Sequence, residues 1–489
     1  MRGDFPRLAR GTAIYGVGGL VTRFISFFLL PVFTAYLTPA DYGISSMLVF
    51  LSFVLTPLFS LGLGTSLGIC YFDDAKEGEG RKSASVWTAF LILLASSSAM
   101  VVLGTVFSRE ISLLLFQSDG YGYFVILSVL TTCAGVLRLP LMLYLQFEER
   151  AKLFVVLSTL SALISVSTSL FLVVALRGGI KGYIEAGLIS QAVSLVIFLI
   201  PAGKLKFRFA KNVARELLRH GIPMIPSFLC LFVLQQGNRY ALQYYDGIES
   251  VGLYTVGYSI GMVMNLLANA FTSAWTPYFL SFMGKEEEAR KNFGRVLTYY
   301  TFGFGTVSLL FYAFAKPVIL VMTQPAFLEA YKVIGLTATA SFLTGMFSLF
   351  LPGVYFAKEV KFVSLIQGVS AVVALVLFVV LIPAFGIVGA ALSLVLGTLV
   401  MIVLMHCWNV RRRSAYLQIE YEWGRLLTYA AIYVACAGLL LVERSFATSW
   451  ELVLSVVVSV VVVSAVYFLL DDKEREVLGR YLVFSRHGT

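Results

Sequence analysis

Basic side chains inside apolar segments are the residues of this chain most suited to chemistry. The stretch GGLVTRFISFFLLPVF, residues 18–33, carries Arg23 near its middle, and Arg138 and Arg239 fall inside two other apolar stretches. A cation at the centre of a bilayer costs about 2.5 to 3.5 kcal/mol on insertion scales. Each arginine therefore needs water or an anion around it. Guanidinium suits phosphate, because it donates two parallel hydrogen bonds.

Polar and small residues recur at helical spacing beside these arginines. Four segments carry such stripes at steps of three or four: Thr12, Gly16, Gly19, Arg23 and Ser26; Thr131, Gly135 and Arg138; Gln235, Arg239 and Gln243; Asn265, Asn269, Thr272 and Thr276. The spacing places each stripe on one helical face, which lines either water or a partner helix. Snorkelling to the membrane surface is an alternative that suits Arg239 better than the other two arginines. We predict a wet cavity with these substrate-binding residues: Arg23, Arg138, Arg239, Gln235, Asn265 and Asn269.

The acidic residues decide the sign of the expected cargo. No Asp or Glu falls in the middle of an apolar segment, and the nearest, Glu185 and Asp246, lie close to segment ends. A lumen with cations and no buried counter-charge favours an anion, and a phosphate-bearing one fits the arginines. The three histidines and five cysteines show no ligand spacing, so we predict no metal site, no cofactor and no catalytic residue.

Composition sets the elements that must position these side chains. The chain has 489 residues, of which 59% are hydrophobic and 13% charged. A bilayer crossing needs about 20 helical residues, and hydrocarbon leaves an apolar run no alternative to the helix. We predict an all-α membrane protein with about fourteen transmembrane helices, near residues 9–37, 42–71, 83–106, 120–147, 153–176, 183–203, 217–244, 251–282, 296–315, 326–356, 362–382, 387–408, 424–442 and 450–470.

The distribution of Lys and Arg predicts the topology. With both termini in the cytoplasm, most basic loop residues fall on the cytoplasmic side, as the positive-inside rule requires. The exceptions on the other side are Arg109, Arg177, Lys181, Lys316 and Arg444. This asymmetry accounts for most of the net charge of +10 without a nucleic-acid partner.

Weak internal matches predict a duplicated half. Gly43 of DYGIS aligns with Gly252 of SVGLY, and Lys152 aligns with Lys361, each pair 209 residues apart. Six spans per repeat give two lobes of like orientation related by a pseudo-two-fold axis, with the site expected between them. The predicted organisation is an N-lobe, 1–203; a basic cytoplasmic linker, 204–216; a C-lobe, 217–408; a cytoplasmic loop, 409–423; two further helices, 424–470; and a cytoplasmic tail, 471–489.

Several stretches resemble one family. The opening ARGTAIYGVGGLVTRFISFFLLPVFTAYLTPADYG, with VGLYTVGYSIG, FLEAYKVIGLTATASFLTGMFSLFLPGVYFAKE and FGIVGAALS, is similar to the bacterial polysaccharide-biosynthesis, or oligosaccharide flippase, family. That family belongs to the multidrug/oligosaccharidyl-lipid/polysaccharide exporter superfamily. The resemblance implies a fourteen-helix, two-lobed, multi-pass protein of the bacterial inner membrane that opens alternately to either side.

The same resemblance implies a cargo. Such proteins move undecaprenyl-pyrophosphate-linked oligosaccharides to the periplasmic leaflet for O-antigen, capsule or exopolysaccharide synthesis, with a polymerase and chain-length proteins as expected partners. Relatives have a cationic central cavity, which Arg23, Arg138 and Arg239 fit. A lipid II flippase and a multidrug exporter remain alternatives, although the latter would need buried carboxylates. A membrane glycosyltransferase or polymerase would need an extramembrane catalytic loop, and the outer connections here are short, so we do not expect an enzyme.

Overall fold

A computed structural model describes residues 28–74, 79–203, 205–357, 359, 361–411, 418–442, 448–472 and 474–475. This part of the chain is helical nearly throughout and contains no strand, which confirms the predicted all-α class. The first predicted span lies largely outside the described residues. Arg23 is among those that are not described.

The helices follow the predicted spans closely. They are α2 Leu30–Tyr36, α3 Pro39–Ser60, α4 Leu63–Asp74, α5 Glu79–Val106, α6 Ser108–Phe116, α7 Gly122–Phe147, α8 Ala151–Leu170, α9 Gly179–Ala202, α10 Lys211–Gly221, α11 Ile225–Asp246, α12 Ile248–Gly261, α13 Val263–Leu280, α14 Glu286–Ala313, α15 Ala315–Met322, α16 Tyr331–Phe347, α17 Pro352–Phe356, α18 Lys361–Arg411, α19 Trp423–Val442 and α20 Thr448–Leu469. A π-helical turn, Phe171–Ala175, follows α8.

Length and hydropathy qualify only some of these helices as membrane spans. Among the described residues, nine helices can cross a bilayer, or eleven if each of two bent pairs counts as one span. The bent pairs join α10 to α11 and α12 to α13. The element α18 has 51 residues and corresponds to two predicted spans, because Gly386 interrupts it with a φ of 51°.

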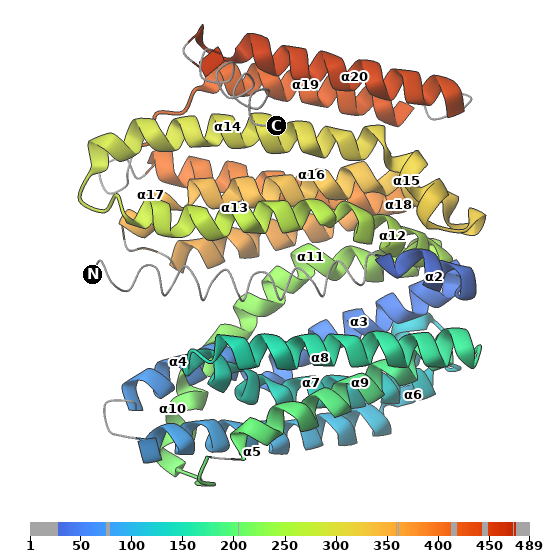
Figure 1. Ribbon diagram of the computed structural model, residues 1–489, viewed down its shortest axis with the longest axis vertical. Coiled ribbons are helices and arrows are strands. Elements are labelled where there is room, and N and C mark those ends of the chain that lie inside the picture. Colours follow the sequence, from blue (N-terminus) through green and yellow to red (C-terminus); the bar gives the residue numbers. More distant parts are fainter. Residues whose placement is uncertain are drawn as a thin grey trace, which may run out of the picture. The chain divides into compact units, whose positions relative to one another are not determined.

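The chain divides into two compact units. The first contains Met1–Thr255, Met322–Phe327 and Leu375–Ala390, and the second contains the remainder. In the first unit, α7 packs against α5 and α9, and α8 packs against α9 (Figure 1). The unit extends past the predicted linker and includes α11. The lobe boundaries drawn from the sequence stay a prediction.

A capping box starts α3. The Thr38 hydroxyl accepts a hydrogen bond from the Asp41 backbone amide at 3.2 Å, and the Asp41 carboxylate accepts one from the Thr38 amide at 2.8 Å. Pro39 occupies the first turn, where its missing N–H costs nothing. The sequence LTPAD therefore starts the helix at a defined residue.

A close backbone contact docks α10 on the break between α3 and α4. Leu61 and Gly62 adopt left-handed φ values of 53° and 67°, which end α3. A Cβ on Gly62 would overlap the Gly221 backbone, and a Cβ on Gly221 would overlap the Leu61 carbonyl oxygen. Only glycine lets the two segments approach so closely.

Two segments that the predicted repeat aligns with each other are in contact in the first unit. A Cβ on Gly43 would overlap the Ile248 carbonyl oxygen, and a Cβ on Gly252 would overlap the Pro39 carbonyl oxygen. Each carbonyl belongs to the residue four places before the opposite glycine. The Thr255 hydroxyl also donates to Ser46 Oγ at 2.8 Å, across a sequence separation of 209. The start of α3 and the start of α12 thus meet in a reciprocal contact.

In the second unit, α16 is the central helix, with nearly every side chain buried. It packs against α13 and α14, and α14 also contacts α19 and α20 (Figure 1). Hydroxyl groups link three of these helices, because Tyr433 Oη lies 2.9 Å from Ser308 Oγ and 2.7 Å from Thr339 Oγ1. Pairing of this kind satisfies polar groups that would otherwise be stranded in an apolar core.

A charged cluster joins the ends of α19 and α20 to α14. Arg425 donates to Glu422 at 3.0 Å, to Glu474 at 2.6 Å and to the Leu469 carbonyl oxygen at 2.8 Å. Tyr299 donates to the other oxygen of Glu474 at 2.6 Å. The planar guanidinium thus satisfies three acceptors from two segments at once.

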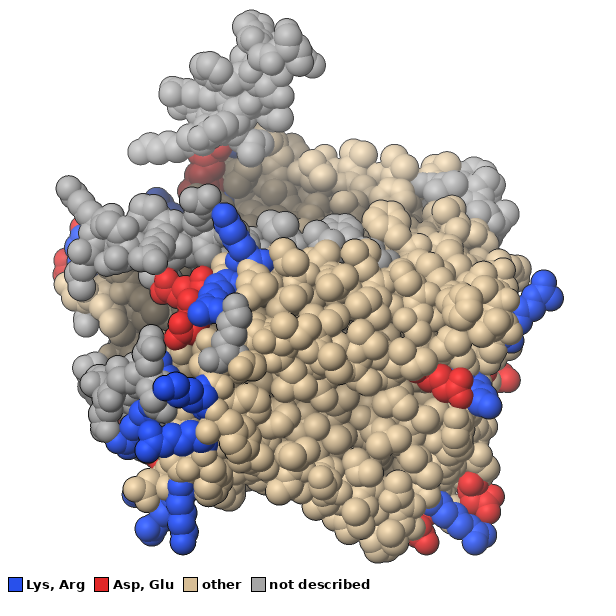
Figure 2. Space-filling model, turned by 60° about the horizontal axis from the view of Figure 1, so that its bottom comes forward, with Lys and Arg blue, Asp and Glu red and all other residues tan. Residues whose placement is uncertain are grey.

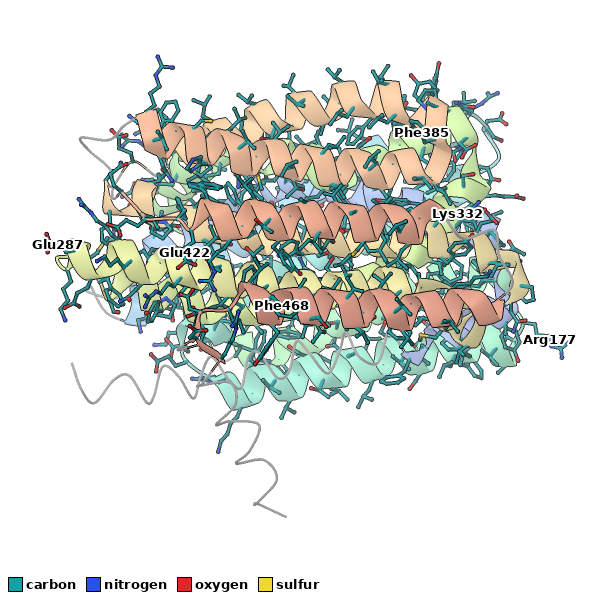
Figure 3. All side chains as sticks on the ribbon, turned by 90° about the horizontal axis from the view of Figure 1, so that it is seen from above. Arg177, Glu287, Lys332, Phe385, Glu422 and Phe468 are labelled. Carbon is teal, nitrogen blue, oxygen red and sulfur yellow. The ribbon has the colours of Figure 1, made fainter. Side chains whose placement is uncertain are left out.

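Charge lies at the helix ends. Figure 2 shows Lys, Arg, Asp and Glu gathered at two edges of the visible face, with other residues covering the surface between them. In the second unit, Glu287 and Glu422 lie toward one end of the helices and Lys332 lies at the other (Figure 3). An uncharged surface between charged ends is what a lipid-exposed body requires.

Candidate functional site

Arg138 lies in a cavity of the first unit. It belongs to α7 and is half-buried. One of its guanidinium nitrogens donates to Ser194 Oγ on α9 at 2.6 Å, and Ser194 donates onward to Ser161 Oγ on α8 at 2.9 Å. The guanidinium carbon also lies 5.9 Å from the centre of the Phe198 ring, in a cation–π contact.

The cavity around Arg138 is rich in hydroxyl groups. Its volume is about 340 Å³. Its polar lining comes from three helices: Thr131 and Arg138 on α7; Ser158, Ser161 and Ser165 on α8; and Ser190, Gln191 and Ser194 on α9. None of the residues that line it is acidic. Ligand sites span about 300 to 1,000 Å³, so this volume suits a small headgroup rather than an oligosaccharide.

The electrostatics of the cavity favour an anion. In the part of the chain that the structure describes, Arg138 forms its hydrogen bond to a serine and no ion pair. The surrounding hydroxyls are neutral, so the positive charge is not cancelled locally. Serine and threonine hydroxyls can donate to phosphate oxygens while the guanidinium supplies the charge.

The helix α8 forms an outer wall of this cavity. None of its side chains is buried, and the apolar side chains of Val156, Leu160 and Leu163 are exposed. Apolar side chains exposed on a membrane span face lipid. The serines at 158, 161 and 165 repeat at steps of three and four, so they share a helical face.

The polar residues predicted on α11 lie elsewhere in the first unit. Arg239 is buried and donates to the Gln236 side chain, one turn earlier. Gln243 is also buried, whereas Gln235 is exposed. Asn238, which the sequence stripe did not include, donates to Tyr254 Oη at 2.6 Å and to the Ala390 carbonyl oxygen at 3.2 Å. These residues do not line the cavity of Arg138.

The predicted asparagines belong to the second unit. Asn269 Nδ2 donates to Asn265 Oδ1 at 2.6 Å along α13. Asn269, Ser273 and Thr276 are exposed, and Asn265 is half-buried. An exposed polar stripe on a membrane span is expected to face water, because hydrocarbon cannot solvate amides or hydroxyls.

Sequence reasoning missed most of the cavity wall. It found Thr131, Gly135 and Arg138 on one face of α7, but not the serines of α8 and α9. Their helical spacing is a signal that a search of every span for polar faces would have found. Arg23 lies outside the described residues, so its place relative to these groups is not described.

The sequence of this chain matches one known protein family. A family described as polysaccharide biosynthesis protein matches residues 8–283. No curated protein matches the chain.

Solved structures with the same fold include two transporter types. A lipid II flippase MurJ structure in an inward closed conformation is similar with a TM-score of 0.72 and 13% identity, over 93% of this chain and 99% of that one. An inward-facing multidrug resistance MATE family transporter of the MOP superfamily has a TM-score of 0.68 and 13% identity, over 83% of this chain and 95% of that one. At this identity the similarity concerns the fold.

Proposed function

Because the chain belongs to the polysaccharide biosynthesis protein family, we propose that it is a flippase for an anionic, undecaprenyl-pyrophosphate-linked oligosaccharide. It carries this lipid from the cytoplasmic to the periplasmic leaflet of the bacterial inner membrane, for the synthesis of a surface polysaccharide such as O-antigen, capsule or exopolysaccharide. The observation that carries the proposal is Arg138, a cation without a paired carboxylate among the described residues, in a cavity lined by hydroxyls.

The size and position of the cavity indicate that the pyrophosphate, the prenyl chain and the glycan of the cargo occupy different places. The pyrophosphate binds Arg138 and the serines, because about 340 Å³ admits a headgroup and not a glycan. The prenyl chain stays in lipid beside α8, where Val156, Leu160 and Leu163 are exposed. The glycan follows a wet path, for which Arg23, Arg239, Gln235, Asn265 and Asn269 are the proposed polar lining. Transport proceeds by alternating access and makes or breaks no covalent bond.

The test is transport in proteoliposomes. Undecaprenyl-pyrophosphate oligosaccharide is placed in one leaflet, and its transfer is followed for wild type, Arg138→Ala and Arg138→Lys at equal folded protein. We expect a loss of at least tenfold in Arg138→Ala and partial retention in Arg138→Lys, which keeps the charge but not the fork. Arg109→Ala is the matched control, because Arg109 is exposed and paired with Asp119 at 3.1 Å.

Other outcomes would redirect the proposal. Equal transport by wild type and Arg138→Ala would remove Arg138 from the cargo site. A lipid II flippase shares this fold, so lipid II is the competing cargo, and faster transport of lipid II would replace the proposed substrate. Transport of a cationic drug alone would favour a multidrug exporter, although no acidic residue lines the described cavity.

A further inference from the structure

A thiol, a carboxylate and an imidazole meet at the contact between α4 and α10. Cys70 Sγ, a Glu216 carboxylate oxygen and a His220 ring nitrogen all lie within 4.8 Å of one another. Glu216 and His220 are four residues apart on α10, so they share one face of that helix. Cys70 comes from α4, which packs against α10. Sequence spacing alone does not reveal the cluster, because the cysteine is distant along the chain.

We propose that Cys70, Glu216 and His220 bind a transition-metal ion, with Zn²⁺ as the preferred occupant. Thiolate, imidazole and carboxylate are the three ligand types that Zn²⁺ takes in proteins, and water completes a tetrahedron. Calcium and magnesium prefer sites built from oxygen alone, so the thiol selects against them.

Small side-chain movements would bring the three ligand atoms to the separations that a bound Zn²⁺ requires. Ligand atoms of a tetrahedral Zn²⁺ lie about 3.2 to 3.8 Å apart, because the bonds are about 2.0 to 2.3 Å long. Cys70 is buried, whereas Glu216 is half-buried and His220 is exposed. The two side chains on α10 therefore have the freedom to rotate onto an ion held by the buried thiol.

The surroundings support metal binding in two ways. His220 Nδ1 lies 3.0 Å from the Glu216 carbonyl oxygen. A carbonyl only accepts, so this contact favours the tautomer with a proton on Nδ1 and a lone pair on Nε2, the arrangement usual for a metal-bound histidine. Cys70 is also a buried member of an apolar cluster that includes Leu67 and Leu217. Such a shell limits water access to the thiolate side of an ion.

Binding would release one proton from the Cys70 thiol to solvent, since the thiolate is the ligand form. The bound ion would then link α4 to α10 by bonds from both helices. This link adds to the contact between Gly62 and Gly221, which lies at the C-terminal end of α10 beside His220. The bound ion thus acts as a cross-link that holds α10, the segment that leads into α11, against α4.

The experiment uses the purified full-length protein, stripped of metal with a chelator and titrated with Co²⁺. We expect one Co²⁺ per chain with the charge-transfer absorption of a cobalt–thiolate bond, and loss of that absorption on addition of excess Zn²⁺. Cys70→Ser should remove the thiolate band. His220→Ala and Glu216→Gln should each weaken binding at least tenfold.

Cys133→Ser is the matched control, because Cys133 packs against the same apolar cluster but lies outside the trio. It should keep both the band and the affinity. His220 is exposed, so His220→Ala should fold, and Zn²⁺ should raise the melting temperature of wild type but not of this variant. Absence of a thiolate band in wild type, or its persistence in Cys70→Ser, would overturn the site.

Discussion

Glu148 shows how a single carboxylate is held at the end of a span. It follows the last residue of α7 and accepts hydrogen bonds from the Tyr71 hydroxyl and from Lys82 Nζ, the latter at 3.3 Å. The hydrogen bond from Tyr71 lowers the pKa of Glu148 below its ordinary value of 4.5, burial opposes this shift, and the Lys82 contact adds to the lowering. The charged form of Glu148 therefore stabilises the folded state.

The sign of this shift gives a pH prediction. A carboxylate whose pKa is lower in the folded state contributes its full stability above pH 4.5 and loses it as the pH falls through the folded value. We expect Glu148→Gln to lower the free energy of unfolding by about 1 to 2 kcal/mol at neutral pH. The deficit should shrink below pH 4.5, which melting temperatures across an acid titration will measure. Exposed Glu110→Gln is the control, and a deficit that ignores pH would contradict this account.

At the scale of the element, the docking of α10 depends on the absence of a side chain. Gly221→Ala places a methyl group against the Leu61 carbonyl oxygen, which belongs to backbone and cannot rotate away. We expect a loss of about 1 to 3 kcal/mol, the range for overpacking, seen as a lower melting temperature. Gly438→Ala on α19 is the control, because its Cβ would meet no atom within 4 Å. An equal response from both variants would mean that the contact does not limit the fold.

The cluster around Arg425 gives a second prediction for elements. Burial raises the pKa of Glu474, but hydrogen bonds from Arg425, Tyr299 and the Asp471 amide outweigh it and lower the pKa. Arg425→Ala should destabilise the attachment of α20 by about 1.5 to 3 kcal/mol, the range for bonds to charged groups. Arg425→Lys should recover less than half, because an ammonium cannot reach three acceptors in one plane. Limited proteolysis after α19 will measure detachment, and full rescue by lysine would show that charge alone suffices.

Most helices could be predicted from sequence because an apolar run in lipid has no other way to pair its backbone. The break at Gly386 was also foreseen, as the boundary between two spans. Side-chain partners were harder. Arg239 pairs with Gln236 on its own helix, which spacing can suggest, whereas Arg138 pairs with Ser194 on a different helix. Contacts of the second kind depend on how helices pack, and one sequence does not encode that in its periodicity.

For the molecule as a whole, the reciprocal contact between α3 and α12 tests alternating access. Ser46 and Thr255 hydroxyl oxygens lie 2.8 Å apart, so Ser46→Cys with Thr255→Cys should form a disulfide on mild oxidation. If the two helices must separate during transport, oxidation should reduce proteoliposome flux at least tenfold and reduction should restore it. Each single variant controls for oxidation of the native cysteines. Undiminished flux in the fully cross-linked protein would mean that this contact stays closed throughout the cycle.

Gly43 and Gly252 also constrain how the gene can change. Most positions in two repeats of a chain can diverge independently, because a residue in one repeat does not contact the neighbours of the equivalent residue in the other. Here a larger residue in either copy pushes apart the same two backbones. Mutations at these two positions are therefore not independent. We expect the sequence match between the two repeats to persist at this contact after the other matches have been lost.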